Sequence, residues 1–406
     1  MSLSEEVARI VASAVDPAAA TADQLARFPR GAVTTLGRKG VLGMPAARRL
    51  GGGGHGLAET ARVVERVAVS CAGTATVLRS HFAAAAVLDV HGTPEVRADL
   101  AAGRHLSTLA VFDAGPDRLF LSPEGTARGH GGVVDLYARK AWVISAGEAD
   151  SYVWSSRPSG GRGASTLWFV PGQAPGLLVP ADRGGIGLRA SAATTVRADP
   201  VRVPETNRLG ESGAGADLVL DLALPWFLGL GSAVALGIME GVLAAVSAEL
   251  RGGPPRTAGG PAGGAPVGGR GAARPGQHRG GGGTESFVGV RGGGGGGWGV
   301  GPGPGGPAPA ELTRMRLRAN AVRVLHDEAL STFGWDPARA LPKLFHLCLA
   351  SAEAVIAVTD QAMKLCDQAA FRGDVGIERR FRDARAHCAV EPTVDTVLAV
   401  AAALSR

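Results

Sequence analysis

Paired cysteines are absent from this 406-residue chain, whose four cysteines stand singly and form no CxxC motif. That pattern argues against a disulfide scaffold and a zinc ribbon, and it favours a reducing cytoplasm. Charged residues are also few, at 19%, whereas 45% of residues are hydrophobic, so the chain is not generally disordered and can bury a large core. The first 15 residues include early acids and no unbroken apolar run, so they predict no secretory signal.

The sequence also lacks the usual signals of a metal site, a phosphate-binding loop and a nucleic-acid-binding surface. The nine histidines show no metal-ligand spacing, and no glycine run leads from a strand into a helix as a phosphate loop requires. The net charge of +6 comes almost entirely from residues 251–310, which hold six arginines and one acid. Since the rest of the chain is nearly neutral, we expect no nucleic-acid partner.

Residues 251–310 are the main break in composition, with 26 of the 62 glycines and 9 of the 25 prolines. Glycine and proline at this density cannot hold a helix or a packed sheet. The helical pattern stops after Leu250 and resumes at about Ala308. Two interpretations stay open: a disordered linker, or a frame shift, because GC-rich coding DNA read out of phase yields glycine, arginine, proline and alanine.

The remaining sequence predicts three domains. Residues 1–105 have helical periodicity, residues 106–215 have short valine- and aromatic-rich runs between turn residues, and residues 216–406 return to helix around the interruption at 251–310. Leu222 to Met239 is free of charge and long enough to approach a membrane span. Its proline, its glycines and its bordering acids favour a buried helix of a bundle instead, so we expect no membrane partner.

Five short segments follow one another in an order that is typical of one protein family. They are residues 40–45, 140–147, 185–191, 378–385 and 391–393. In this order and spacing the chain resembles the acyl-CoA dehydrogenase family of flavoproteins, and the likeness covers most of the chain outside 251–310. The resemblance implies an α+β multidomain fold with an N-terminal helical domain, a small central β-barrel-like domain and a C-terminal four-helix bundle.

By this resemblance, residues 140–147 form the strand that carries FAD. Trp142 would cover the flavin ring, since a flat aromatic side chain can stack on it. Ile144 stands where the family usually has threonine, and Ser145 offers a hydroxyl one position later. Adjacent residues of a strand point to opposite faces, so the contact at these two positions is expected to be through the backbone.

Three further residues are assigned to the flavin by the same resemblance. Phe112 ends the strand that precedes the flavin strand, and Thr393 and Asp395 lie near the C-terminus. Phe112 and Asp113 replace the family's threonine and glutamate, which weakens the case for ordinary CoA substrates.

Glu391 is the candidate catalytic base. It lies nine residues after Arg382, as does the base that some family members carry near the C-terminus. Pro392 disfavours helix at the preceding residue and suits the first position of a new helix, so Glu391 is expected at a break between helices. An acid that only stabilises a helix start is the alternative. The family's other position for a base is occupied here by Phe227 or an apolar neighbour.

Two other features have structural interpretations. His387 precedes Glu391 by four residues, and a solvated or capping role is favoured over a catalytic one. Arg382 and Asp383 are expected to form an ion pair.

The resemblance implies FAD-dependent α,β-dehydrogenation of an acyl thioester, carried by CoA or by an acyl-carrier protein. It further implies an electron-transfer flavoprotein or oxygen as acceptor, a homodimer or homotetramer, and no metal. Two alternatives stay open: a flavin-dependent monooxygenase of the same fold, and a non-catalytic relative that serves as a binding protein.

Overall fold

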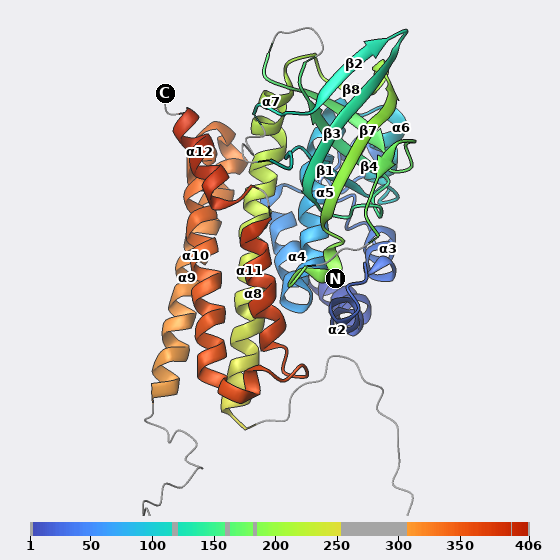
Figure 1. Ribbon diagram of the computed structural model, residues 1–406. Helices are drawn as coiled ribbons and strands as arrows, with labels where there is room; N and C mark the ends of the chain where they lie inside the picture. The colour runs from blue at the N-terminus through green and yellow to red at the C-terminus, as the bar shows by residue number, and fades with distance from the viewer. Residues whose placement is uncertain are drawn as a thin grey trace, which may run out of the picture.

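The computed structural model describes residues 3–115, 121–158, 163–181, 185–252, 307–390 and 392–404. Helices of the N-terminal region lie against a β-region on one side and against a bundle of long helices on the other (Figure 1). The fold predicted by the resemblance is therefore present. The 251–310 segment falls almost wholly outside the described residues.

The N-terminal region consists of helices α1 to α6. Their bounds are α1 Leu3–Ile10, α2 Asp16–Gln24, α3 Arg30–Arg38, α4 Leu57–Ser70, α5 Ala72–His91 and α6 Pro94–Ala101. Helix α5 is apolar on all sides and buried along most of its length, because it packs on α4, on the β-region and on the bundle at once. A polar side chain on α5 is therefore placed inside the molecule.

The β-region consists of two four-stranded sheets. One has the order β1-β4-β5-β8, with β1 Ser107–Ala110, β4 Ser151–Ser156, β5 Thr166–Pro171 and β8 Arg208–Leu209. The other has the order β2-β3-β7-β6, with β2 Thr126–His130, β3 Val133–Val143, β7 Thr194–Pro204 and β6 Leu177–Leu178.

The expected small β-domain is present, but its two described sheets do not form a closed barrel. Among the described strands no hydrogen-bonded ladder joins the edges of the two sheets into a closed barrel. Instead, inward-facing side chains of both sheets share one core, which includes Tyr152, Trp154, Trp168, Leu136 and Val203. Two small sheets bury their apolar faces against each other in this way without closing.

The C-terminal region is the expected helical bundle. Its helices are α7 Gly215–Leu218, α8 Leu224–Leu250, α9 Pro307–Trp335, α10 Pro337–Ala370, α11 Ile377–Ala389 and α12 Val394–Leu404. Helix α8 lies at the centre and contacts α4, α5, α9, α10 and α11. Its apolar stretch is long enough to cross a membrane, but 89% of the most apolar window is buried in the protein. The expectation of a buried bundle helix is confirmed. A second helix, α10, also passes the length and composition test, with 39% of its window buried.

Candidate functional site

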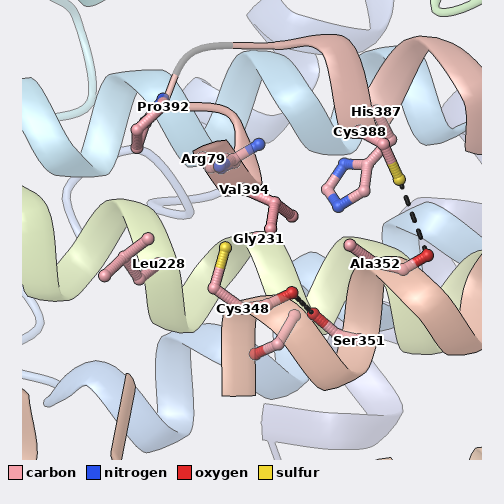
Figure 2. A pocket seen from close by; sticks show the side chains of 11 residues that line it. Arg79, Leu228, Gly231, Cys348, Ser351, Ala352, His387, Cys388, Pro392 and Val394 are labelled. Carbon is pink, nitrogen blue, oxygen red and sulfur yellow. Dashed lines mark hydrogen bonds between the residues drawn. The ribbon is translucent and has the colours of Figure 1, made fainter. Parts of the chain in front are cut away.

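A small cavity lies where α5, α8, α10, α11 and the segment leading into α12 meet (Figure 2). Its volume is about 20 Å³, which is room for about one water molecule. The lining residues are Arg79, Leu228, Gly231, Ser232, Cys348, Ser351, Ala352, His387, Cys388, Pro392 and Val394.

Arg79 supplies the charge of this cavity. Its side chain is 3% exposed, its Nε donates to the Phe227 carbonyl at 2.9 Å, and its guanidinium carbon lies 3.8 Å from the centre of the Phe227 ring. Its Nη1 is buried and has no hydrogen-bond partner among the residues that the structure describes. Burial lowers the pKa of Arg79 to about 10, so the group still carries its charge at neutral pH.

Gly231 makes room for this guanidinium on the central helix. A Cβ at position 231 would meet the guanidinium carbon and Nη2 of Arg79 at 3.0 Å, closer than side chains normally approach. The absence of a side chain at this turn of α8 therefore lets α5 place a cation against the bundle.

His387 faces the same cavity from the last turn of α11. The residue is 7% exposed, and within the described part of the chain its Nδ1 has no hydrogen-bond partner. Burial, with a smaller contribution from Arg79, lowers the pKa of His387 to about 3, so the ring is neutral at pH 7. The expected solvated role is wrong, because α11 packs against α8 and α10 and turns this residue inward.

The two cysteines of the cavity are neutral. Burial raises the pKa of the Cys348 thiol above its usual value, although Arg79 opposes the shift. Burial raises the pKa of Cys388 to about 11, and its thiol donates weakly to the Ala352 carbonyl at 3.7 Å. Among the described residues that line the cavity, Arg79 therefore carries the only charge.

The predicted base, Glu391, lies outside the described residues. Its chain neighbours are described: Val390 and Pro392 are buried, and Pro392 lines the cavity. Helix α11 ends at Ala389 and α12 begins at Val394, so position 391 falls between two helices, as the proline predicts. Its role as a base stays a prediction.

Trp142 and Phe112 lie in neighbouring segments of the β-region. Strand β3 shifts register between Lys140 and Val143, and Trp142 within this bulge has a φ of 49°, which is uncommon for a large side chain. Its indole is 37% exposed, so it is accessible to a flat ligand. The Phe112 carbonyl accepts a hydrogen bond from the N–H of Ala141 at 2.9 Å, whereas its ring is buried in the core.

Ile144 and Ser145 are buried at the end of β3. The Ile144 side chain is in the core, and its carbonyl accepts a hydrogen bond from the Thr108 hydroxyl at 2.7 Å. The Ser145 N–H donates to the Ser191 carbonyl at 2.9 Å, and Ser145 also has a left-handed φ, of 55°. Of the three residues assigned to the flavin on this segment, Trp142 has the exposed side chain.

Thr393 and Asp395 lie at the start of α12, which packs on α10. The Thr393 hydroxyl accepts from the N–H of Thr396 at 3.3 Å, the geometry of a helix N-cap. Asp395 is exposed in the first turn, where an acid stabilises the helix dipole. Local helix chemistry accounts for both residues, and their assignment to the flavin stays a prediction.

A buried ion pair next to the bulge escaped the sequence analysis. Lys140 is fully buried, and its Nζ lies 2.8 Å from Asp113 Oδ1 and donates to the Ser155 hydroxyl at 2.8 Å. Burial lowers the pKa of Lys140, and Asp113 opposes that shift. The alternation of inward and outward side chains along β3 could have indicated that Lys140 is buried, since Val134, Leu136 and Lys140 share its inward face. Asp113 thus has a structural role.

The expected pair of Arg382 with Asp383 is wrong. Arg382 binds Asp23 at 2.6 Å and Glu378 at 2.7 Å. Asp383 accepts from the N–H of Leu188 at 2.6 Å, and burial raises its pKa to about 6. Consecutive residues of a helix do not face each other, so each finds a partner in another segment or another turn.

Comparison with known proteins identifies the N-terminal region by sequence. Residues 1–103 match the family model of the acyl-CoA dehydrogenase N-terminal domain. The short-chain specific acyl-CoA dehydrogenase of Clostridium acetobutylicum is 27% identical over 58% of this chain and 64% of its own length. The amino sugar nitrososynthase RubN8 of Streptomyces rubradiris is 31% identical over 57% of this chain and 55% of its own. The chain thus matches less than two thirds of either relative.

Solved structures match over almost the whole chain. Butyryl-CoA dehydrogenase of Megasphaera elsdenii has a TM-score of 0.78 at 18% identity and covers 100% of this chain and 99% of its own. The prolyl acyl carrier protein oxidase AnaB has a TM-score of 0.79 at 20% identity, covering 99% and 97%. PigA, solved with FAD and proline, has a TM-score of 0.78 at 18% identity, covering 98% and 94%. The resemblance is thereby confirmed: the N-terminal domain matches the acyl-CoA dehydrogenase family by sequence, and the whole chain has the fold of these solved structures.

Proposed function

We propose that this protein is an FAD-dependent dehydrogenase of an acyl thioester. The observation that carries the proposal is the polar cavity of Arg79 and His387, which is bordered by the segment between α11 and α12. That segment contains Glu391, the predicted base. The fold places the described neighbours of Glu391 beside a buried polar cavity.

Trp142 is the residue whose surroundings fit a flavin best. It lies on a bulge, has an accessible indole face and follows the strand position that the resemblance assigns to FAD. The structural neighbour PigA, solved with FAD, supports the same cofactor. When bound, FAD supplies the acceptor for the hydride that leaves the β-carbon of the substrate.

In this proposal Glu391 acts as the base that removes the α-proton while the α,β double bond forms. Burial of Val390 and Pro392 on either side supports a site from which water is excluded. A desolvated carboxylate is a stronger base than one in water. Pro392 restricts the backbone next to Glu391, which favours a single position of its carboxylate.

The variant Glu391→Gln tests this assignment. It removes the proton acceptor at nearly constant volume, so we expect flavin reduction by a thioester under anaerobic conditions to slow by about 10²- to 10⁴-fold. Glu353→Gln, an exposed acid on α10, is the matched control and should leave the rate unchanged. An equal rate in the Glu391→Gln variant and the parent would leave Glu391 as a helix-start acid.

A flavin monooxygenase is the second candidate function. The relative RubN8, 31% identical over 57% of this chain, is named for making a nitroso group on an amino sugar. The replacement at Phe112 and Asp113 of residues typical of the family's substrate site also supports a different substrate. Reduction of the flavin by a nicotinamide or a reductase, but by no thioester, would favour this function. Folded protein that stays colourless after FAD is added would favour the non-catalytic alternative.

The proposed protein is a homo-oligomer that uses an acyl carrier and an electron acceptor. The exposed apolar side chains of α9 include Leu317, Val324 and Trp335, each more than 60% exposed, which supports a homodimer or homotetramer. The acyl carrier is CoA or a carrier protein, the acceptor is an electron-transfer flavoprotein or oxygen, and the location is the cytoplasm. Light scattering and steady-state assays with each carrier and acceptor test these points.

A further inference from the structure

The segment of residues 185–191 connects helix α11 with the end of β3, the strand assigned to FAD. The carboxylate of Asp383 on α11 accepts a hydrogen bond from the N–H of Leu188 at 2.6 Å. The Leu188 carbonyl accepts from the N–H of Ser191 at 2.8 Å, and the Ser191 carbonyl accepts from the N–H of Ser145 at 2.9 Å. Three hydrogen bonds in series therefore link α11 to the residues that follow β3.

Packing holds this segment directly against α11. A Cβ at Gly187 would meet the Arg382 carbonyl oxygen at 2.2 Å, so the close approach requires glycine. Arg382 also donates to the Ile186 carbonyl at 2.7 Å. The four residues of the hydrogen-bond series are buried, so water does not readily replace a bond that is lost. A change at Asp383 is therefore expected to reach the other end of the series.

Backbone strain is concentrated along the same route. Of the six non-glycine residues in the described chain that have a left-handed φ, four lie on or next to the series, with φ between 49° and 55°: Trp142, Ser145, Leu188 and Ala192. Such conformations persist only where surrounding contacts enforce them, and they cluster at ligand sites. Trp142, with its accessible indole, thus lies in a bulge whose shape the surrounding protein enforces.

We propose that Asp383 is a positioning residue that fixes the bulged end of β3 for the flavin, through the hydrogen bonds of Leu188 and Ser191. Asp383 acts without touching the cofactor, because it holds the backbone that presents Trp142. The same helix leads into the segment that contains Glu391, so α11 would align the flavin strand with the predicted base. The inference rests on the proposed function, since it requires FAD beside Trp142.

Hydrogen exchange of the purified full-length protein tests the series without any variant. If the bonds depend on one another, the amides of Leu188, Ser191 and Ser145 should open with the same free energy and respond together to a low concentration of denaturant. Saturation with FAD should slow the exchange of all three by a similar factor. Three unrelated opening free energies would overturn the proposal.

The variant Asp383→Ala removes the first acceptor of the series. The loss of a hydrogen bond to a charged group predicts that exchange at Ser145, measured relative to the amides of α8, speeds up by about 10- to 100-fold. The Kd for FAD should rise by a similar factor, and the absorption band of the bound flavin should change shape because the surroundings of its ring change. Asp383→Asn keeps an oxygen acceptor, so it should retain most of the protection and affinity.

The variant Asp336→Ala is the matched control. The Asp336 carboxylate also accepts a backbone N–H, that of Arg339 at 3.2 Å, but it caps the start of α10 in the bundle. This variant should lower the free energy of unfolding. Relative exchange at Ser145, the Kd for FAD and the flavin spectrum should stay unchanged.

Three results with the variants would overturn the assignment. Faster exchange at Leu188 with unchanged exchange at Ser145 would show that the bonds are independent. Faster exchange at Ser145 with an unchanged Kd and spectrum would show that the bulge does not position the flavin. Equal losses in Asp383→Asn and Asp383→Ala would show that the charge of Asp383, rather than its hydrogen bond, is responsible. If Asp383→Ala does not fold, the exchange measurements on the parent protein decide.

The same measurements distinguish this inference from the proposed function. Flavin reduction by a thioester, in a protein whose three amides open independently, would uphold the dehydrogenase and overturn the positioning role. Coupled amides and an Asp383-dependent Kd, in a protein whose flavin is reduced by no thioester, would uphold the positioning role and overturn the dehydrogenase.

Discussion

The molecule contains two buried cations in matched surroundings, one in the β-region and one in the helical region. Lys140 and Arg79 are each almost fully buried, each donates to one neutral oxygen, and each lies close to an aromatic ring. Lys140 has Asp113 at 2.8 Å, whereas Arg79 has no ion-pair partner in the described residues. The difference distinguishes a buried charge that is neutralised by an ion pair from one that has no ion-pair partner among the described residues.

Removal of one member of the paired site should have the largest effect on stability. Lys140→Met leaves the Asp113 carboxylate buried without its cation, which typically destabilises a protein by about 3–5 kcal/mol. Chemical denaturation of the parent and the variant measures this difference. Asp99→Asn, which breaks the exposed pair with Arg104, is the control and should cost less than about 1 kcal/mol.

A double variant tests whether the lost stability comes from the unpaired charge of Asp113. Lys140→Met combined with Asp113→Leu removes both charges, so most of the lost stability should return. If the double variant is as unstable as Lys140→Met, packing rather than charge explains the effect.

The second-largest effect is expected in the pH dependence of the free energy of unfolding, which depends on the protonation of His387 beside Arg79. The pKa of His387 is lowered to about 3 in the folded protein, against about 6.5 when unfolded. The unfolded chain therefore binds more protons between these values, so the contribution of His387 is complete above pH 6.5 and is lost as the pH falls toward 3. Protonation there would place a second cation beside Arg79.

The variant His387→Gln isolates this contribution. Between pH 7 and pH 5 the stability of the parent relative to the variant should fall by about 2 kcal/mol, since each pH unit below 6.5 is worth about 1.4 kcal/mol. Denaturation curves across this range measure it. Parallel pH profiles of parent and variant would show that His387 is not buried in its neutral form.

Arg79→Met should have the smallest effect on stability, although it is the same kind of change as Lys140→Met. The variant loses a hydrogen bond and a ring contact, but it also relieves the burial of an uncompensated charge, so we expect a change within about 1 kcal/mol. Denaturation of the two methionine variants side by side makes the comparison. A loss at Arg79 as large as at Lys140 would imply that Arg79 has a counterion.

The sequence by itself determined the order of the regions and most element types. Periodicity and turn residues place helices before and after the strands, and the proline after Glu391 marks the break between α11 and α12. The apolar face of α8 was predicted to be buried because proline and bordering acids made a membrane span unfavourable. These are local properties, which neighbouring residues along the chain decide.

Only the tertiary structure decided which polar groups meet. Arg79 and His387 are about 300 positions apart, and each sits in a helix whose own pattern gives no sign of the other. Asp113 meets Lys140 because the segment after β1 forms a single β-bridge with β3. Arg382 binds Asp23 rather than Asp383 because helix geometry turns the two neighbouring side chains apart. Burial and the choice of partner depend on packing between distant segments, so the pKa shifts of Arg79 and His387 and the cavity that both residues line arise only in the folded chain.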